Sequence, residues 1–422
     1  MTTSPTAQHC PAPRELDDLE LLSSGALAPL TGFNRPGSPV TLALPEDLEK
    51  ALADGGTVEL VDPEGLPLAT VVDDGHGLAV TPLTHAQYGP FRRLYLSPAQ
   101  TSERYAGRPL VVVTEPLTDT QRDQLAAAGP VLVLALVGHG TASLSAVGLL
   151  RATLVATADL DAEVVAVPLA AHGDAEGDAA LRAQVVATYA GSSRVLELAP
   201  GGAVLPEVAP IVAAEHPPKD EQGLVLFFTG LSGSGKSTLA QALMDRLLER
   251  GGRSLTSLDG DVVRRNLSAG LTFSKADRET NIRRIGWVAA EIARHGGVAV
   301  CSPIAPFDET RQQVRQYVSD AGGAFFLVHV ATPLEECERR DRKGLYAKAR
   351  RGEIPEFTGI SSPYEEPDDA DVRVDTTGRT IDEALDDVLV ALQESGYLDL
   401  TGDDLAPAGR AHGHGGSEPH GG

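Results

Sequence analysis

The segment Gly230-Leu-Ser-Gly-Ser-Gly-Lys-Ser237 most constrains what this chain of 422 residues can fold into. It follows the apolar run 224–229 and precedes a helical pattern over residues 238–250. Glycines at these spacings let successive backbone N–H groups turn inward around phosphate oxygens, and the positive end of the following helix adds to the attraction. A G-x-x-x-x-G-K-[ST] pattern between a strand and a helix predicts a site for a nucleoside triphosphate.

Two side chains of this segment have expected roles of their own. We expect Lys236 to reach the β- and γ-phosphate oxygens and the Ser237 hydroxyl to ligate Mg²⁺, which would enter the site with ATP. The predicted ATP-binding residues are Gly230, Leu231, Ser232, Gly233, Ser234, Gly235, Lys236, Ser237 and Thr238.

Composition excludes several other classes of function. The formal net charge of −24 opposes general binding to nucleic acid, because it offers no broad cationic surface for phosphates. The three cysteines have neither metal-ligand nor disulfide-framework spacing, which favours a reducing compartment. The N-terminus lacks a signal-peptide pattern, and no apolar run approaches membrane-spanning length. We therefore expect a soluble cytoplasmic protein with neither nucleic-acid nor membrane partners.

The chain shows several shifts of pattern that predict domains. Short apolar runs such as 58–61 and 110–113, separated by Gly, Pro and Asp turns, predict a β-rich domain over residues 1–116. Strand and helix patterns then alternate, which predicts a small α/β domain over 117–212. A polar segment with a Pro pair, 213–222, is interpreted as a linker.

The second half alternates regularly between strands and helices. The expected fold class is α/β, with a P-loop kinase domain built on a parallel sheet over residues 223–398. The tail, 399–422, is rich in Gly and His and is predicted to be disordered. The expected strands are 224–229, 254–258, 298–302, 324–330 and 372–375, and a last helix is expected at 381–395.

An acidic pair, Asp259 and Asp261, follows the second of these strands. Ligands of parallel sheets bind at the carboxyl ends of the strands, so this pair should face the phosphates. One carboxylate, for which we expect Asp259, can hold magnesium, and the other can accept a proton from an attacking hydroxyl. The alternative interpretation is an ordinary Asp-Gly turn.

The next block carries cations and an amide at helical spacing. Ser274 begins a predicted helix on which Arg278 and Asn281 share one face. Such a pair can hold an anionic group and a purine-like edge together. Arg283 and Arg284 fit either this role or a solvated surface equally well.

A cation-rich block follows at residues 339–352 and includes Lys343. Cations on such a segment of an acidic protein fit a lid that closes over a polyphosphate, and the alternative is a solvated charged helix. Phe357, soon after, can supply an aromatic face for a base or can be a core residue.

Taken together, residues 223–398 resemble the adenylylsulfate kinase (APS kinase) family. The motifs occur in the family's order, which makes the resemblance specific. They are the phosphate-binding segment, Asp259-Gly-Asp261 with Arg264, Phe273-Ser274 with Asp277-Arg278, Asn281-Ile-Arg-Arg-Ile-Gly286, Lys343-Gly-Leu-Tyr346, Phe357-Thr-Gly-Ile360 and Pro363-Tyr-Glu365.

The resemblance implies transfer of the ATP γ-phosphoryl group to the 3′-hydroxyl of adenosine 5′-phosphosulfate, giving 3′-phosphoadenylyl sulfate (PAPS) and ADP in sulfate assimilation. It implies that Asp261 and Lys236 are catalytic, with Asp261 at the 3′-hydroxyl as base or metal organiser. The residues that it implies for binding adenylyl sulfate are Asp261, Arg264, Phe273, Arg278, Asn281, Ile304, Ala305, Lys343 and Phe357, with the two phenylalanines enclosing adenine.

One position departs from the family. The family commonly has Ile-Ser-Pro-Tyr after the third strand, and its serine has been assigned as a phosphorylated residue. This chain has Ile304-Ala-Pro-Phe307 instead. Ala305 has no hydroxyl, so a phosphoserine is impossible there, but direct in-line transfer needs no such intermediate.

The first half resembles a shortened ATP sulfurylase, with a PUA-like start at residues 21–33 and a remnant of the nucleotide-binding domain at 131–200. The sulfurylase signature, Gln-x-Arg-Asn with a following pair of histidines, is replaced by Leu134-Ala-Leu-Val-Gly-His-Gly-Thr141. His139 alone cannot supply the cations that adenylyl transfer needs. We therefore expect no sulfurylase activity, and a structural, regulatory or docking role, with ATP sulfurylase as a possible partner.

Two other functions compete with this interpretation. Another small-molecule P-loop kinase would share the loop but not Phe273, Arg278 with Asn281, and Lys343-Gly-Leu-Tyr together. A non-catalytic binding module would not need Lys236 and Asp261, which are both present. Because the family is often dimeric, we expect a homo-oligomer.

Overall fold

The computed structural model describes residues 7–272, 274–341 and 343–399, apart from the side chain of Asp261. The chain forms two compact units, Met1–His216 and Pro217–Gly422. The expected His-rich tail lies outside the described residues, except for Asp399. Within the described ranges, no helix combines the length and the apolar character that crossing a membrane requires.

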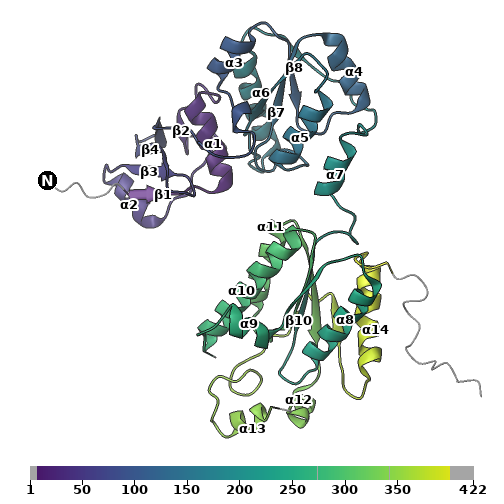
Figure 1. Cartoon of the computed structure of the whole chain (residues 1–422). Helices are drawn as coiled ribbons and strands as arrows, with labels where there is room; N and C mark the ends of the chain where they lie inside the picture. The colour runs from purple at the N-terminus through teal and green to yellow at the C-terminus, as the bar shows by residue number, and fades with distance from the viewer. Residues whose placement is uncertain (1–6, 273, 342, 400–422) are drawn as a thin grey trace, which may run out of the picture. The chain divides into compact units, whose positions relative to one another are not determined.

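The first unit begins with a lobe built on a mainly antiparallel sheet of strand order β1-β3-β4-β5-β2, in which only the β1–β3 pair is parallel (Figure 1). The turn between β3 and β4 is set by Asp62, whose side chain accepts hydrogen bonds from the backbone N–H groups of Glu64 and Leu66. The elements of this lobe are β1 (Ala7–His9), α1 (Pro13–Ser24), β2 (Gly32–Phe33), α2 (Glu46–Ala53), β3 (Val58–Val61), β4 (Pro67–Asp73) and β5 (Leu78–Pro82).

The second lobe of this unit is a parallel sheet of strand order β8-β7-β6-β9 with helices around it. Side chains at the helix starts explain where the helices begin: Thr118, Ser145 and Asp174 accept backbone hydrogen bonds as N-caps. The elements are η1 (Arg92–Leu94), α3 (Pro98–Tyr105), β6 (Leu110–Val113), α4 (Asp119–Ala128), β7 (Val131–Leu136), α5 (Ala146–Ala156), β8 (Ala162–Val167), α6 (Ala175–Ala190), β9 (Val195–Leu196) and α7 (Ala209–Glu215).

The structure corrects our placement of strand β6. We expected Leu110–Val113 in the β-rich domain 1–116, but it pairs in parallel with β7 and belongs to the second lobe. Leu110 and Val111 are fully buried. An apolar run that is buried on both faces is typical of a strand inside a parallel sheet, and this explains the difference.

Helix α7 occupies the first part of the segment expected to be a linker, 213–222. Its last residue, Glu215, accepts hydrogen bonds from the backbone N–H and the hydroxyl of Ser145, each at 2.6 Å. Because Ser145 caps helix α5, this contact holds the end of α7 against the start of α5.

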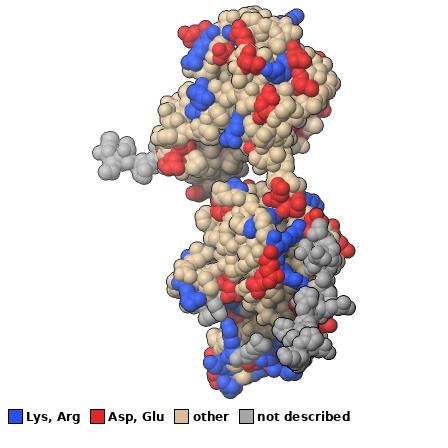
Figure 2. Space-filling view, turned by 45° about the vertical axis from the view of Figure 1, so that its right-hand side comes forward, with Lys and Arg blue, Asp and Glu red and all other residues tan. Residues whose placement is uncertain are grey.

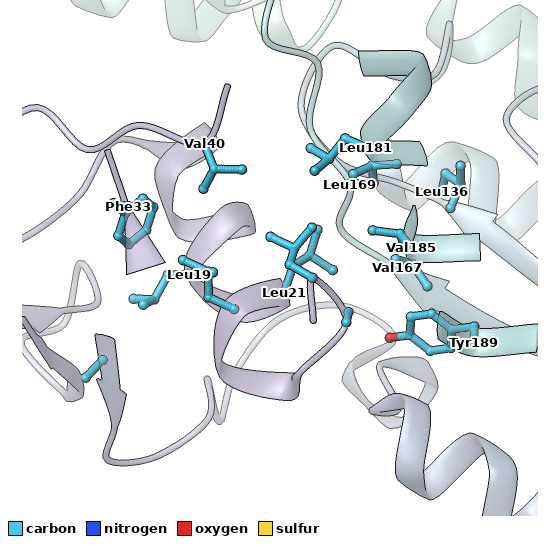
Figure 3. Close-up of a cluster of buried hydrophobic side chains, with 14 of the residues drawn as sticks. Leu19, Leu21, Phe33, Val40, Leu136, Val167, Leu169, Leu181, Val185 and Tyr189 are labelled. Carbon is cyan, nitrogen blue, oxygen red and sulfur yellow. The ribbon is translucent and has the colours of Figure 1, made fainter. Parts of the chain in front are cut away.

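The two lobes of the first unit share one hydrophobic core (Figure 3). Leu19 and Leu21 of helix α1 pack in the same cluster as Leu181 and Val185 of helix α6. Burial of apolar side chains contributes about 25 cal/mol per Å² of area removed from water, so a shared core favours joint folding of the lobes. The β-rich and α/β parts that we expected as separate domains are therefore one compact unit.

Helix α1 also contacts the second lobe through two acid–histidine pairs, Asp18 with His172 and Asp17 with His139. Asp18 contacts Nε2 of His172 at 3.1 Å, and Asp178 contacts Nδ1 of the same ring at 3.0 Å. The Asp18 and His172 side chains are 0% and 2% exposed. Beside them, the Asp17 carboxylate contacts Nδ1 of His139 at 2.6 Å. Buried polar groups are tolerated when they are paired, as Asp18 and His172 are.

The second unit is a five-stranded parallel sheet of strand order β11-β12-β10-β13-β14. The expected α/β class with a parallel sheet is confirmed, and each of the five expected strands is present. The elements are β10 (Leu224–Thr229), α8 (Lys236–Arg250), β11 (Leu255–Leu258), α9 (Gly260–Asn266), α10 (Lys275–Arg294), β12 (Val298–Cys301), α11 (Asp308–Asp320), β13 (Ala324–Val330), α12 (Leu334–Arg340), α13 (Leu345–Arg350), β14 (Val372–Val374) and α14 (Ile381–Glu394).

Helices cover both faces of this sheet (Figure 1). Helices α8 and α14 pack on one face, and α10 and α11 pack on the other. Gly286 lets α10 approach α11 closely, since a Cβ atom there would lie 2.5 Å from a methyl carbon of Val314. Strand β10 is central, so its carboxyl end, where the phosphate-binding segment begins, lies between the ends of β12 and β13.

The buried Asp18 gives the first unit a predicted dependence on pH. Burial raises the pKa of Asp18 from 3.8 to about 6, although the neighbouring His172 and Arg14 act in the opposite direction. The folded state therefore holds a proton that the unfolded state releases, and this advantage is lost as the pH rises from about 4 through about 6. We expect the free energy of unfolding to fall by about 1–3 kcal/mol from this group across that window.

The variant Asp18→Asn should show a smaller fall, because its side chain cannot ionise. Urea titrations followed by circular dichroism at several pH values measure the difference, with Asp47→Asn as a control on the exposed side of helix α2. Equal slopes against pH in the wild type and Asp18→Asn would contradict the expectation.

Candidate active site

The phosphate loop (residues 230–235) joins β10 to α8 and is held by its neighbours. Gly235, directly before α8, has φ of 98°, a left-handed conformation that glycine adopts without strain. The carbonyl oxygen of Ser234 accepts hydrogen bonds from the hydroxyls of Thr332 at 3.0 Å and Thr376 at 2.9 Å. These two contacts fix the loop from the ends of strands β13 and β14.

A cavity of about 720 Å³ opens over the phosphate loop at the carboxyl ends of the parallel strands. Its size is within the range of small-molecule sites. It brings together residues that are far apart in the sequence, as expected for this edge of a parallel sheet. The predicted site residues that line it are Ser232, Gly233, Gly235, Lys236, Ser237, Thr238, Asp259, Arg264, Arg278, Asn281, Ile304, Ala305 and Lys343.

Some predicted residues do not line this cavity. Ser234 is fully buried beneath the loop, and Leu231 lines a separate groove with Gly359. Gly230 belongs to the loop but not to the cavity wall. The side chain of Asp261 and the whole of Phe273 lie outside the described part of the chain.

Lys236 is nearly buried, with 9% of its surface exposed, at the start of α8. Its Nζ donates a hydrogen bond to the carbonyl oxygen of Leu231 at 3.1 Å. Burial lowers the pKa of Lys236 to about 8, while Cys337 and Asp259 act in the opposite direction. A partly desolvated ammonium that faces a cavity is a strong electrostatic partner for an anion.

Asp259 lies at the end of β11, and Ser302 follows the neighbouring strand β12. The Ser302 hydroxyl donates a hydrogen bond to Oδ2 of Asp259 at 3.0 Å, and both residues line the cavity with Ser237. Carboxylate and hydroxyl oxygens are donors that Mg²⁺ prefers. Across the described ranges, no group of three His, Cys, Asp or Glu residues has metal-binding geometry. This donor set fits a cation that is held largely by phosphates and water.

Arg278 and Asn281 also line the cavity, and their spacing puts them on one face of helix α10. Nη1 of Arg278 donates to the Thr358 hydroxyl at 2.9 Å, and Asn281 is only 4% exposed. Nε of Arg278 and Oδ1 of Asn281 are buried without a hydrogen-bond partner in the described residues. Buried polar atoms are usually paired, so these two beside a cavity indicate a place for a polar ligand.

The segment after β12 places Ile304 and Ala305 in the cavity wall. Ala305 has φ of 43°, which is uncommon for a residue with a Cβ atom, and it is 1% exposed. Its carbonyl oxygen accepts a hydrogen bond from the buried Arg311, and the Thr229 hydroxyl donates to the carbonyl of Ile304 at 2.6 Å. Strained backbone held by surrounding contacts is typical of functional sites.

Helices α12 and α13, here called the lid segment, carry the cation-rich block. Lys and Arg side chains gather over this end of the second unit (Figure 2). Arg339, Arg340 and Lys343 line the cavity, whereas Lys348 and Arg350 are exposed. Part of the block therefore faces the cavity and part of it is exposed to solvent, whereas closure over a polyphosphate stays a prediction.

Phe357 differs from its expected position, because it does not line the cavity in this structure. Its ring is half-buried against Tyr346, edge to face, with 5.0 Å between the ring centroids. Such aromatic pairs are favourable beyond their buried area. The adjacent Thr358 is in the cavity wall.

Sequence reasoning did not single out several residues that the fold brings to the cavity. Arg340 donates to the Thr376 hydroxyl at 2.8 Å and to its carbonyl oxygen at 3.0 Å. The available signal was position: Ser302 is the last residue of one predicted strand of the parallel sheet, and Thr376 directly follows another. Ser302, Thr376 and Arg379 are residues of this kind. Arg340, Tyr346 and Thr358 also line the cavity, and in the sequence they belong to the cation-rich block and the family motifs without an expected role of their own.

The corresponding strand end in the first unit has a different character. His139 follows β7, and both its backbone N–H, at 2.9 Å, and its ring Nδ1, at 2.6 Å, contact Oδ2 of Asp17. The hydrogen bond with Asp17 raises the pKa of His139. The one histidine that we expected at this place is therefore already paired with a carboxylate from helix α1.

Comparisons with known proteins match the second unit to one family. The family model described as "Adenylylsulphate kinase" matches residues 222–375. Among solved structures, "Hexameric APS kinase from Thiobacillus denitrificans" is similar to this chain with a TM-score of 0.69 and 28% identity, over 94% of each chain.

The matching curated relatives have a different name. A sulfate adenylyltransferase of Neosartorya fischeri is 49% identical over 194 residues, which are 46% of this chain and 34% of the relative. A sulfate adenylyltransferase of Coccidioides immitis is 47% identical over 194 residues, with the same shares. The chain thus spans about a third of the length of the curated relatives that it matches.

The lowered pKa of Lys236 predicts how nucleotide binding depends on pH. Bound phosphates favour the ammonium form, so affinity is retained below about pH 8 and falls as the pH rises through about 8. We expect the dissociation constant of a non-hydrolysable ATP analogue, measured by calorimetry, to rise about tenfold between about pH 7 and about pH 9.5.

The variant Lys236→Met should bind more weakly at every pH and should lose this dependence. Lys219→Met is the matched control, because Nζ of Lys219 donates to the Ser395 carbonyl outside the cavity wall. If Lys236→Met keeps the wild-type pH profile, another group is responsible for it.

Proposed function

Because residues 222–375 belong to the adenylylsulphate kinase family, we propose that this chain transfers the γ-phosphoryl group of ATP to the 3′-hydroxyl of adenosine 5′-phosphosulfate (APS). The products are 3′-phosphoadenylyl sulfate and ADP. The observation that carries the proposal is one cavity that is lined both by the phosphate loop and by Arg278 and Asn281, each of which has a buried polar atom without a partner in the described residues.

The donor side of the proposed reaction is the phosphate loop. Its backbone N–H groups and the start of α8 attract the ATP phosphates, and Lys236 faces the β- and γ-phosphates from within the cavity. Thr332 and Thr376 hold the loop in place through Ser234, so little reorganisation accompanies binding. Arg339 and Arg340 of the lid segment add positive charge near the transferred group.

Magnesium fits the oxygen donors of this wall. Ser237 and Asp259 would hold it, and Ser302 would orient the Asp259 carboxylate through the hydrogen bond between them. When bound, the cation neutralises charge that develops on the phosphate oxygens. Magnesium does not need a site made of protein ligands alone, because phosphates and water would supply its remaining ligands.

The acceptor side is the wall formed by helix α10 and the segment after β12. Arg278, with Arg264 and Lys343, attracts the phosphosulfate group, and Oδ1 of Asn281 accepts a hydrogen bond from the adenine amine. We assign Asp261, at the second position of helix α9, as the base for the 3′-hydroxyl.

In the transfer step, the 3′-oxygen attacks the γ-phosphorus while the bond to the β–γ bridging oxygen breaks. The hydroxyl proton passes to Asp261, and ADP leaves with the electron pair of the broken bond. No phosphorylated side chain is needed, which agrees with alanine at position 305. The residues hold the two nucleotides in line, and proximity supplies much of the rate.

A second candidate function, sulfate adenylyl transfer, is favoured by the names of the curated relatives. Adenylyl transfer needs cations around the triphosphate. At the relevant strand end of the first unit, His139 is paired with the Asp17 carboxylate, which repels phosphate. The relatives match over 34% of their length, so their activity can reside in parts that this chain does not match. We propose that the first unit lacks this activity and acts in structure, regulation or docking.

Two further assignments follow from the same proposal. The small-molecule substrates would be ATP and adenosine 5′-phosphosulfate, and ATP sulfurylase is a possible partner because it would supply the acceptor. We also propose a homo-oligomer. The similar Thiobacillus denitrificans protein is hexameric, so its assembly supports an oligomer without fixing the number of subunits here.

Replacement of Asp261 tests the proposed base. In Asp261→Ala, kcat should fall about 10²–10⁴-fold, because the 3′-hydroxyl loses its proton acceptor, while ATP binding stays within about threefold of the wild type. A coupled assay of ADP release, with and without APS, measures the first quantity, and calorimetry measures the second. Asp320→Ala, at the end of helix α11, is the control. Turnover near the wild-type rate in Asp261→Ala would rule out this role.

The first unit is tested by the reverse reaction of a sulfurylase. We expect the purified whole chain to make no ATP from APS and pyrophosphate above the rate of a heat-treated sample, because the first unit lacks cations at His139. The variant Asp17→Asn, which removes the competing carboxylate, should remain inactive, since one histidine still cannot replace the missing cations. ATP formation by the wild-type chain, detected with luciferase, would overturn this proposal.

A further inference from the structure

Tyr346 is a buried aromatic residue of the lid segment that contacts two separate parts of the site. Its side chain is 2% exposed and lines the cavity. Its hydroxyl donates a hydrogen bond to the carbonyl oxygen of Ser232, in the phosphate loop, at 2.8 Å. Its ring packs edge to face on Phe357, with 5.0 Å between centroids and 79° between the ring planes.

The backbone of Tyr346 is fixed from within the lid segment. The Asp341 carboxylate accepts hydrogen bonds from the backbone N–H of Tyr346 at 3.1 Å and from that of Ala347 at 3.0 Å. These are the first orphan donors of helix α13, so Asp341 caps the helix. The backbone of Tyr346 is therefore fixed, and the contacts of its side chain can fix the residues that it touches.

The hydroxyl contact completes the support of the phosphate loop. Thr332 and Thr376 hold the loop at the Ser234 carbonyl, from the strand ends. Tyr346 holds it two residues earlier, at Ser232, from the lid segment. Burial raises the pKa of the Tyr346 phenol, so the hydroxyl keeps its proton and remains a donor near neutral pH.

The ring contact reaches the acceptor wall. Phe357 precedes Thr358, whose hydroxyl accepts a hydrogen bond from Arg278. The backbone N–H of Phe357 donates a hydrogen bond to the Ser361 hydroxyl at 2.9 Å. The Tyr346 ring is thus packed against a short segment whose next residue, Thr358, contacts Arg278, the cavity residue whose Nε atom is buried without a partner in the described residues.

We propose that Tyr346 is a positioning residue that couples the donor loop to the acceptor wall: its hydroxyl sets the phosphate loop, and its ring sets Phe357 and the Arg278 wall. We call the effect of the hydroxyl on the phosphate loop the donor arm of this inference, and the effect of the ring on Phe357 and Arg278 the acceptor arm. The acceptor arm rests on the proposed function. The inference assigns the hydroxyl of Tyr346 to the binding of ATP and its ring to the binding of APS. A side chain that only stabilised the fold would not affect the two substrates separately.

The hydroxyl is tested alone by Tyr346→Phe, which keeps the ring. We expect the dissociation constant for a non-hydrolysable ATP analogue and KM for ATP to rise about three- to tenfold, as for the loss of one hydrogen bond, with KM for APS within about twofold of the wild type. Tyr317→Phe, on helix α11, is the matched control because Tyr317 lies outside the cavity wall.

The ring is tested by Tyr346→Leu and Phe357→Leu. Phe357→Leu should raise KM for APS about three- to tenfold and leave KM for ATP unchanged, whereas Tyr346→Leu should raise both. In the double variant, the effects on KM for APS should be less than multiplicative, because both changes remove one aromatic contact.

Several results would overturn the proposal. One is an unchanged ATP affinity in Tyr346→Phe, and another is an equal rise of both KM values with a lower Tm, which a merely structural role predicts. Fully multiplicative effects of Tyr346→Leu and Phe357→Leu would remove the acceptor arm. The calorimetric measurement needs no acceptor, so the donor arm is decided even if the wild-type chain releases no ADP in response to APS, an outcome that would instead reject the proposed function.

Discussion

The carbonyl oxygen of Ser234 is the point on which the geometry of the second unit depends. It accepts hydrogen bonds from Thr332 and Thr376, which follow strands β13 and β14, while Ser234 itself follows β10. Three parallel strands are thereby connected at the edge where the cavity opens. Arg340 joins the same group through the Thr376 hydroxyl and carbonyl. A phosphate loop works only when its N–H groups already point inward, so this preorganisation precedes every other feature of the site.

The charge distribution follows from the same requirement. The chain as a whole carries a formal charge of −24, yet the cavity wall collects Lys236, Arg278 and Arg340. Lys236 is nearly buried, and burial makes an isolated cation costly but effective when an anion enters. The lowered pKa of Lys236 reflects that cost of burial. The net negative charge of the chain disfavours the binding of other polyanions.

In the first unit, the carboxyl ends of the parallel strands carry acid–histidine contacts and not a phosphate loop. Its parallel sheet also ends in a glycine-rich turn, but helix α1 brings Asp17 and Asp18 to the histidines that follow β7 and β8. These acid–histidine contacts and the shared hydrophobic core connect the two lobes. The carboxylates that stabilise the fold at this place are negatively charged and would repel a triphosphate. A role in structure, regulation or docking is therefore consistent with what holds this unit together.

The sequence by itself determined the parallel α/β architecture of the second unit, its five strands and the phosphate loop, because these depend on local periodicity and contiguous spacing. It also placed Arg278 and Asn281 on one helix face. Only the tertiary structure decided that β6 belongs to the second lobe, that Phe357 packs on Tyr346, and that Ser302, Tyr346 and Thr376 reach the cavity. These outcomes depend on which strand ends, helices and loops become neighbours in space, whether they are close in the sequence, as Tyr346 and Phe357 are, or 114 residues apart, as Tyr346 and Ser232 are. Sequence spacing alone carries no record of such contacts.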